Sequence, residues 1–121
     1  MENKITILYV DDEPMNLKLF EINFSKKFNV FTASSGNEGL NVLAQHHSVD
    51  VVISDMKMPG MNGIEFIKKA KIEYPDIKYY ILTGFDITEE IASALENNLI
   101  QQYFQKPFNM QEIEASIYEA L

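Results

Sequence analysis

Short apolar runs alternate along this chain with longer stretches in which apolar residues return every three or four positions. The short runs are rich in β-branched and aromatic residues, as strands are, whereas the spacing in the longer stretches is that of amphipathic helices. Strands are predicted at 5–10, 28–33, 49–54, 79–82 and 100–104. Helices are predicted from about 14 to 27, 35 to 44, 62 to 72, 86 to 95 and 109 to 121. The third strand is apolar enough to be buried, and the fifth is more polar, as an edge strand should be.

The predicted helix starts carry recognisable signals. The first helix opens at Pro14, a residue that is well tolerated in a first helical turn. The other four open on a polar residue with a glutamate three positions later, which is the spacing of a capping box: Ser35 with Glu38, Asn62 with Glu65, Asp86 with Glu89, and Asn109 with Glu112. The third helix should end before Pro75, because the residue before a proline avoids the helical conformation.

The alternation of five strands with five helices predicts an α/β fold with a parallel sheet and helices on both of its faces. Right-handed crossovers restrict the topology further. The chain has 121 residues, 46% of them hydrophobic, which is the size of one domain with a real core. No internal repeat, linker or low-complexity segment divides it, so residues 1–121 are predicted to form a single domain.

Polar side chains stand where the apolar runs end. The third run stops abruptly at Asp55, and the following Met58-Pro59-Gly60 prevents a simple continuation. The first strand ends at Asp11 and Asp12, the fourth at Thr83 and the fifth at Lys106. Ligands of open α/β sheets bind at the carboxyl ends of the strands. If the strand order is 2-1-3-4-5, the first and third strands are neighbours and their three carboxylates converge.

Three carboxylates in one site need a partner of opposite charge. Two unit charges about 4 Å apart repel by about 4 kcal/mol at an effective dielectric constant near 20. Lys106 alone cannot balance three acids, whereas Lys106 together with a divalent cation brings the sum of charges to zero. All the candidate ligands are oxygens, so Mg²⁺ or a similar hard ion such as Mn²⁺ is expected. A carboxylate beside Mg²⁺, a lysine and a hydroxyl suits phosphoryl transfer to Asp55, and Thr83 would be drawn toward the new phosphoryl oxygens.

Composition excludes several other classes of function. The net charge is −8 and all ten basic residues are lysines, a poor composition for direct nucleic-acid binding. The absence of cysteine excludes disulfides and thiolate metal sites. No apolar stretch is long enough to span a membrane, and residues 1–4 lack the design of a signal peptide. A soluble protein in the cytoplasm is therefore expected.

Taken together, the motifs resemble the receiver domain of two-component response regulators. The resemblance covers essentially the whole chain and rests on these segments in order: Asp11-Asp12, Asp55 with Met58-Pro59-Gly60 and Gly63, Thr83-Gly84, and the six residues from Tyr103 to Phe108 with Lys106-Pro107 among them. Each motif is weak by itself, but their combination is specific.

This resemblance implies a flavodoxin-like fold and a set of roles. Asp55 would be the phosphoacceptor, supplied by a sensor histidine kinase or a phosphotransfer protein. Mg²⁺ would bind Asp12, Asp55 and the backbone carbonyl of Lys57, with Asp11 assisting. Thr83 would be the switch hydroxyl and Lys106 the phosphate-binding cation, with a cis peptide bond between Lys106 and Pro107.

The resemblance also implies a signalling surface and a regulatory output. Tyr103 would be a switch aromatic that changes rotamer, and the signalling face would comprise the fourth helix, the fifth strand and the fifth helix. That face would control an output domain or an effector protein, or form a phosphorylation-dependent homodimer. The domain itself would not be an enzyme beyond its own phosphorylation and dephosphorylation. Lys57 and Phe85 occupy variable positions that modulate dephosphorylation in this family, and Asn97-Asn98-Leu99 replaces a common Gly-Ala turn, where Asn can adopt the left-handed conformation.

Other interpretations remain open at this point. Each motif alone also fits a turn, a helix cap, a strand end or a loop, although four such coincidences at four strand ends argue against this. Tyr103 is as typical of packing as of a switch. A Mg²⁺-dependent phosphatase with an aspartyl-phosphate intermediate is the main alternative function, but such enzymes usually have a second acid where Lys57 stands. A flavodoxin-like cofactor-binding protein is a third, disfavoured because the loops are acidic and lack a phosphate-binding loop.

Overall fold

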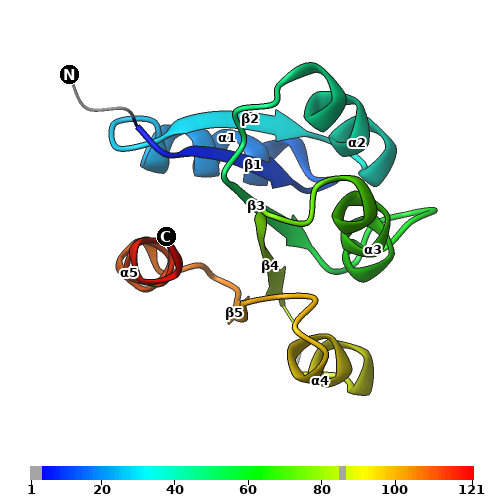
Figure 1. Ribbon diagram of the computed structural model, residues 1–121. Coiled ribbons are helices and arrows are strands. Elements are labelled where there is room, and N and C mark those ends of the chain that lie inside the picture. Colours follow the sequence, from blue (N-terminus) through cyan, green and yellow to red (C-terminus); the bar gives the residue numbers. More distant parts are fainter. Residues whose placement is uncertain (1–3, 85–86) are drawn as a thin grey trace.

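The computed structural model describes residues 4–84 and 87–121 (Figure 1). Within these residues five strands alternate with five helices. In chain order the elements are β1 (Thr6–Val10), α1 (Pro14–Phe24), β2 (Asn29–Ala33), α2 (Gly36–Gln45), β3 (Val51–Asp55), α3 (Gly63–Glu73), β4 (Lys78–Thr83), α4 (Glu89–Glu96), β5 (Gln102–Gln105) and α5 (Met110–Ala120).

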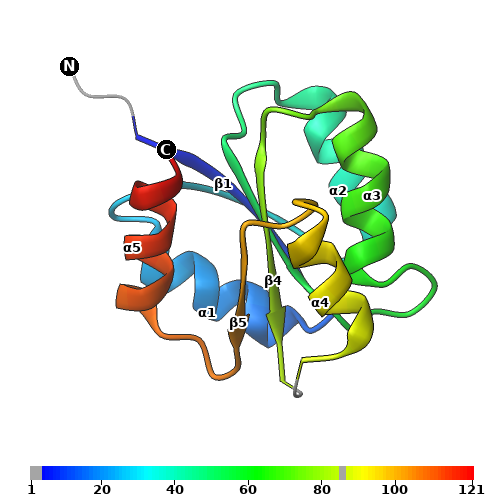
Figure 2. The same ribbon diagram turned by 60° about the horizontal axis from the view of Figure 1, so that its bottom comes forward.

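The five strands form one parallel sheet in the order β2-β1-β3-β4-β5. The register pairs Val10 of β1 with Ala33 of β2 and with Ser54 of β3. Helices α1 and α5 cover one face of the sheet, and α2, α3 and α4 cover the other, as the two views of Figures 1 and 2 show. The predicted α/β fold and strand order are therefore confirmed.

Two hydrophobic layers lie on the two faces of the sheet. Successive strand residues point to opposite faces, so Ile7 and Tyr9 of β1 join the layer under α1 and α5, whereas Leu8 and Val10 join the layer under α2, α3 and α4. All residues of β1 and β3 are buried, because helices cover both faces of these central strands. A fully apolar run such as that before Asp55 is the expected sequence of such a strand.

Several predicted boundaries differ from the observed ones by a few residues. Helix α1 ends at Phe24 rather than near Lys27, because the chain turns over 25–27, where the amides of Lys27 and Phe28 both donate to the carbonyl of Phe24. This turn brings Phe28 into the core beneath α5. At the other end of the chain, the helical stripe ends at Ile117, since Leu121 follows the last residue of α5 and is 56% exposed.

Helix α4 begins later than predicted. Its N-cap is Thr88, whose hydroxyl accepts from the amide of Ile91 at 3.2 Å. The predicted cap, Asp86, lies outside the described residues, as does Phe85. Ile87 precedes the cap and is 43% exposed, so it is not part of the buried stripe of this helix.

The other three predicted N-caps, Ser35, Asn62 and Asn109, are present, but among the described helices α3 alone has a complete capping box. Asn62 and Glu65 form a complete capping box at α3. At α2 the Ser35 hydroxyl accepts from the amide of Glu38, but the Glu38 carboxylate accepts from the amide and hydroxyl of Ser34 instead of closing on Ser35. After α4, Asn98 has φ = 58°, so the expected left-handed conformation is confirmed at this residue.

Within the described ranges, no helix has both the length and the apolar character needed to cross a membrane.

Candidate functional site

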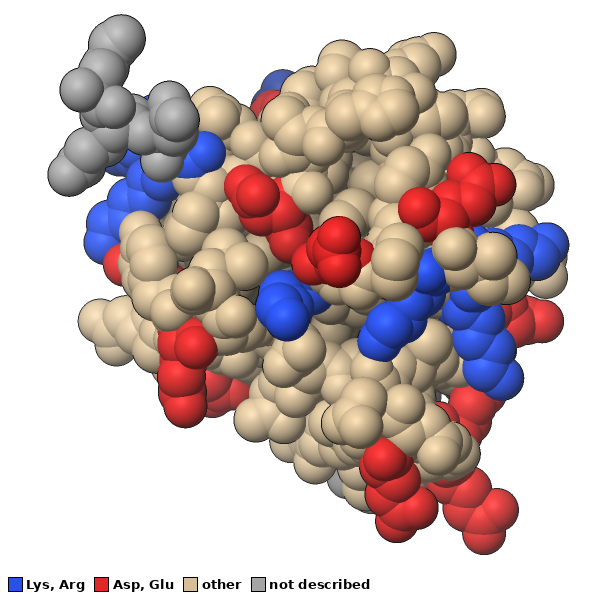
Figure 3. Space-filling view, in the orientation of Figure 1, with Lys and Arg blue, Asp and Glu red and all other residues tan. Residues whose placement is uncertain are grey.

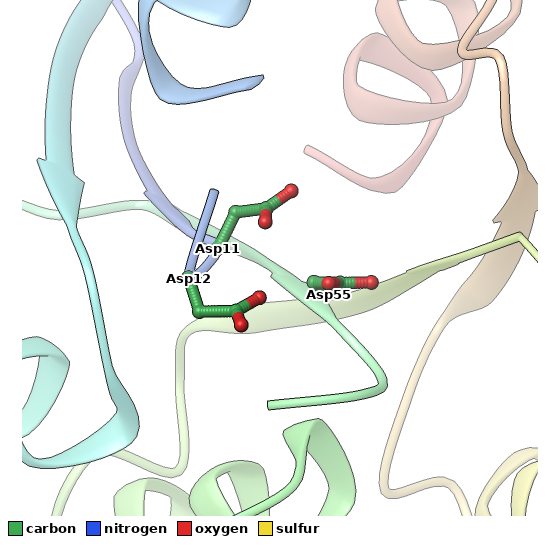
Figure 4. A group of neighbouring side chains, drawn as sticks. All are labelled: Asp11, Asp12 and Asp55. Atoms are coloured by element: carbon green, nitrogen blue, oxygen red, sulfur yellow. The ribbon is translucent and has the colours of Figure 1, made fainter. Parts of the chain in front are cut away.

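The three acids predicted to converge do so at the carboxyl ends of β1 and β3. Oxygen atoms of Asp11, Asp12 and Asp55 lie within 4.8 Å of one another. Figure 4 shows the two side chains that follow β1 beside the one that ends β3. Asp11 is fully buried, Asp55 nearly so, and Asp12 only partly, so the cluster is open to solvent on the Asp12 side.

A close backbone approach behind Asp55 fixes the end of β3. The amide of Gly63, at the start of α3, donates to the carbonyl of Met56 at 2.9 Å. A Cβ atom at position 63 would collide with the backbone oxygen of Asp55 and lie 2.8 Å from the Ile81 side chain. Only glycine fits this contact without a shift of the backbone. The intervening turn uses Gly60, whose φ of 81° is a conformation that side chains disfavour.

Lys106 reaches the cluster from the end of β5. Its Nζ lies 3.1 Å from Oδ1 of Asp55 and 3.5 Å from Oδ2 of Asp11. The backbone positions it, because the Lys106 amide donates to the carbonyl of Thr83 at 2.7 Å. The peptide bond between Lys106 and Pro107 is cis. The lysine therefore balances part of the charge of two of the three acids.

The Asp11 carboxylate accepts from several protein donors. Its Oδ1 receives the amide of Glu13 at 3.0 Å. Its Oδ2 receives the Tyr9 hydroxyl at 2.6 Å and the Asn16 amide group at 3.2 Å, besides the longer contact with Lys106. These donors compensate the burial of a charged group. Burial, followed by the hydrogen bond to Asp11, raises the pKa of the Tyr9 phenol, so the phenol is protonated and can donate at neutral pH.

Burial also raises the pKa of the Asp55 carboxyl group above its usual value. The hydrogen bond from Lys106 acts in the opposite direction, while the charges of Asp11 and Asp12 add to the increase. Proximity of like charges and loss of solvent both disfavour an ionised carboxylate. Burial and the neighbouring acids therefore disfavour the ionised form of Asp55, and a cation bound at the cluster would stabilise that form.

A cavity of about 650 Å³ opens beside this cluster, between α1 and the segment after β5. Tyr9, Asn16 and Lys106 contribute polar groups to its lining, and Leu19 and Phe108 contribute apolar ones. The cavity therefore reaches Lys106 from the side of α1.

Comparison with known proteins agrees with this geometry. A family model described as "Response regulator receiver domain" matches residues 7–118. The chain belongs to the receiver domain family of response regulators.

Individual relatives show the same relationship. The hydrogenase transcriptional regulatory protein HoxA of Cupriavidus necator is 31% identical over 107 residues, which cover 88% of this chain but 22% of that protein. Sporulation initiation phosphotransferase F of Bacillus subtilis is 31% identical over 116 residues, covering 95% of this chain and 92% of the relative. The crystal structure of the response regulator TrrA of Thermotoga maritima, in complex with Mg²⁺ and BeF, is 29% identical with a TM-score of 0.82, covering 97% of this chain and 99% of that one.

Many of the relatives are longer than this receiver domain. The chain spans 24% of one transcriptional regulatory protein, 31% of a cyclic di-GMP phosphodiesterase and 26% of a second regulatory protein. Receiver domains take phosphate from histidine kinases and regulate output domains, and they are signalling domains rather than catalytic enzymes. The Asp11, Asp12 and Asp55 cluster of this receiver domain is consistent with the Mg²⁺ site of such domains.

The receiver domain brings together Asp11, Asp12, Asp55 and Lys106. Thr83 is buried at the end of β4, one residue beyond Leu82, which is the register partner of Asp55. Tyr103 is partly buried on the edge strand β5, against the layer under α3 and α4. Lys57 is exposed in the loop after β3, and Phe85 lies outside the described residues.

Tyr9 and Asn16 are site residues that motif reasoning missed. A signal for Tyr9 was available, since residues two apart in a strand point to the same face, which puts Tyr9 beside Asp11. Asn16 lies in the first turn of α1, where a side chain can reach back toward the end of β1. Neither signal specifies that both side chains donate to one carboxylate oxygen.

Proposed function

We propose that this receiver domain accepts a phosphoryl group on Asp55 from a sensor histidine kinase or a histidine phosphotransfer protein, and that residues 1–121 act as a single signalling domain. The observation that carries the proposal is the position of Asp55. It ends a central strand, beside two further acids, with Lys106 at 3.1 Å. The proposal includes the cytoplasmic location expected from the sequence.

The chemical step is a transfer between two nucleophiles. A carboxylate oxygen of Asp55 forms a bond to phosphorus, and the bond from phosphorus to the donor histidine nitrogen breaks. The nitrogen retains the electron pair and takes up a proton. Lys106 would neutralise charge on the transferring group, and such electrostatic stabilisation is the main contribution a protein makes to phosphoryl transfer. Small phosphodonors would follow the same route, which is the sense in which the domain catalyses its own phosphorylation.

The acid cluster fits a divalent cation, Mg²⁺ or Mn²⁺. The donor set consists of carboxylate oxygens, the ligands that hard cations prefer. Asp12 and Asp55 would hold the ion with the backbone carbonyl of Lys57, while Asp11 assists from its hydrogen-bonded position. Such an ion neutralises negative charge on the phosphoryl group when it is bound.

The signal is proposed to leave the site through Thr83 and Tyr103. Phosphorylation exchanges one negative charge on Asp55 for about two on the phosphoryl group, which favours movement of the Thr83 hydroxyl toward the new oxygens. A change at Thr83 and Tyr103 would alter the face formed by α4, β5 and α5. Such a change transmits a signal only to a partner or output domain that binds one conformation better than the other.

The phosphodonor is proposed to approach over α1. Met15, Leu19 and Ile22 lie at helical spacing on this helix and are 68%, 45% and 62% exposed. Leu19 also lines the cavity that leads to Lys106. An amphipathic helix carrying the donor histidine would cover this stripe, so polar substitutions there should slow transfer from a protein donor and leave transfer from acetyl phosphate unchanged.

The output is proposed to be either a further domain or a separate effector, including a second copy bound through α4, β5 and α5. Direct contact with nucleic acid is not part of the proposal. On the face that Figure 3 displays, several lysines gather at the right, with acidic side chains above and beside them.

Phosphorylation of the purified protein tests the proposal. Incubation with Mg²⁺ and acetyl phosphate should add one phosphoryl group, detected by intact-protein mass spectrometry. Asp55→Asn and EDTA should each abolish the modification, and exposed Asp76→Asn serves as a matched control. A wild-type protein that folds and binds Mg²⁺ yet never becomes phosphorylated would contradict the proposal. Rapid turnover of a generic phosphomonoester would instead support the aspartyl phosphatase.

A further inference from the structure

The Tyr9 hydroxyl makes the shortest hydrogen bond of the acid cluster. It donates to Oδ2 of Asp11 at 2.6 Å, and the phenol is almost completely buried. The ring is held independently of this bond, because it stacks on Phe20 with a centroid distance of 4.2 Å and an interplanar angle of 9°. A rigid ring therefore presents a neutral donor to a charged oxygen from a fixed position.

The oxygen that Tyr9 contacts has competing partners. The Asn16 amide group lies 3.2 Å from the same Oδ2, and the Lys106 ammonium 3.5 Å away. A carboxylate oxygen has room for about two good hydrogen bonds. Tyr9 and Asn16 fill that capacity, and Lys106 stands closer to Asp55, at 3.1 Å.

We propose that Tyr9 is a positioning residue of the receiver site: its hydroxyl occupies Oδ2 of Asp11, which directs Lys106 to Asp55 and weakens the hold of the acid cluster on a divalent cation. This inference rests on the proposed function, because it concerns the same acceptor and cation.

The direction of the effect on the cation follows from linkage. The Tyr9 hydrogen bond stabilises the negative charge of Asp11 most when no cation shares that charge. Its removal destabilises the cation-free protein more than the cation-bound protein. Tighter cation binding must follow, since the two equilibria are coupled. Orientation of Asp11 would survive the change, because Glu13 and Asn16 still hold both carboxylate oxygens.

Tyr9→Phe removes the hydroxyl and keeps the ring. It should bind Mg²⁺ roughly five- to tenfold more tightly than the wild type in isothermal titration calorimetry at neutral pH. Tyr80→Phe is the matched control: Tyr80 is buried in the same layer, and its hydroxyl donates to the Ser116 carbonyl at 3.1 Å, away from the acids. The Mg²⁺ affinity of the control should not change.

Two further readouts separate positioning from a merely structural role. In an Asp11→Asn background, Tyr9→Phe should leave Mg²⁺ affinity unchanged, because the charge that Tyr9 moderates is gone. In the cation-free protein, the Lys106 side-chain NMR resonances should shift in Tyr9→Phe and not in Tyr80→Phe. Neither measurement involves phosphorylation, so failure of the phosphoacceptor proposal and failure of this inference are distinguishable.

The inference is overturned if folded Tyr9→Phe binds Mg²⁺ as the wild type does, or more weakly, since a loosened site loses affinity. Should Tyr9→Phe fail to fold, the wild type provides the test. With ¹³C-labelled tyrosine, Mg²⁺ titration should move the Tyr9 resonance while those of Tyr79 and Tyr80 remain in place. A Tyr9 resonance that ignores Mg²⁺ would refute the inference.

Discussion

Replacing Asp55 by asparagine is expected to stabilise the cation-free domain, although it removes the proposed acceptor. Oxygens of Asp11, Asp12 and Asp55 lie within 4.8 Å of one another, and Lys106 lies 3.1 Å from Asp55. Asparagine has nearly the same shape and still accepts from Lys106. The substitution therefore removes charge while leaving the packing of β3 unchanged.

The distances give the size of the effect. At an effective dielectric constant near 20, each of the two repulsions on Asp55 costs about 3.5 kcal/mol at 4.8 Å, and Lys106 returns about 5 kcal/mol at 3.1 Å. Solvent screens part of the repulsion from Asp12, which is only partly buried. A net gain of about 1 to 2 kcal/mol is expected for Asp55→Asn, or about 5 °C in Tm for a domain of this size.

The assay is urea unfolding followed by far-UV circular dichroism, since the chain has no tryptophan. In EDTA at pH 7.5 the Asn variant should have the higher midpoint with an unchanged slope. In excess Mg²⁺ the order should reverse, because only the wild type retains the full ligand set, and a ligand at about 100 times its Kd contributes about 2.7 kcal/mol.

The pH dependence follows from the raised pKa of Asp55, caused first by burial and then by the neighbouring acids. The folded wild type holds its proton to higher pH than the unfolded chain does. The advantage of asparagine is therefore complete above the raised pKa, shrinks as pH falls through it, and disappears below the unfolded value of about 3.9. An Asn variant that is less stable than the wild type in EDTA at pH 7.5, with Asp76→Asn neutral, would refute the electrostatic reasoning.

Three further predictions concern the elements that support the site. Gly63→Ala should destabilise the domain by about 1 to 3 kcal/mol, because the new Cβ meets the backbone of Asp55. Gly84→Ala is the control: its Cβ would lie 3.8 Å from the Lys106 side chain, so the urea midpoint should barely change. Asn62→Ala should cost about 1 kcal/mol by removing the complete capping box of α3, and equal midpoints for the two proteins would contradict this role. Lys106→Met should destabilise the domain more in EDTA than in Mg²⁺, because the cation replaces the lost counter-charge, and an equal loss in both conditions would count against that account.

Most of the fold and the acidic part of the site follow from local patterns. Alternating strands and helices predict a parallel sheet, and in such a sheet every strand ends at the same edge, so Asp11, Asp12, Asp55 and Lys106 were bound to lie near one another once the strand order was known. The capping-box spacing of Asn62 and Glu65 predicted the start of α3, because an N-cap side chain and the amide three residues later are close together in any helix.

Other features depended on contacts between segments distant in the sequence. Composition does not show that Gly63 must touch the backbone of Asp55, because that contact depends on how α3 packs on the sheet. The start of α4 at Thr88 was also not predicted. Asp86 has a glutamate three positions later, as a capping box requires, whereas Thr88 has Ile91 at that position.

The division of roles within the acid cluster required the tertiary structure. Asp11 and Asp12 are adjacent and chemically identical, yet one is fully buried and bonded to Tyr9, while the other faces solvent. Both residues follow the last residue of β1, and their carboxylates still reach the same cluster. The packing of α1 and the position of Lys106 decide which carboxylate accepts hydrogen bonds from the protein. Hydrogen bonds are sensitive to differences in distance of a few tenths of an ångström, and spacing along the chain does not specify such differences.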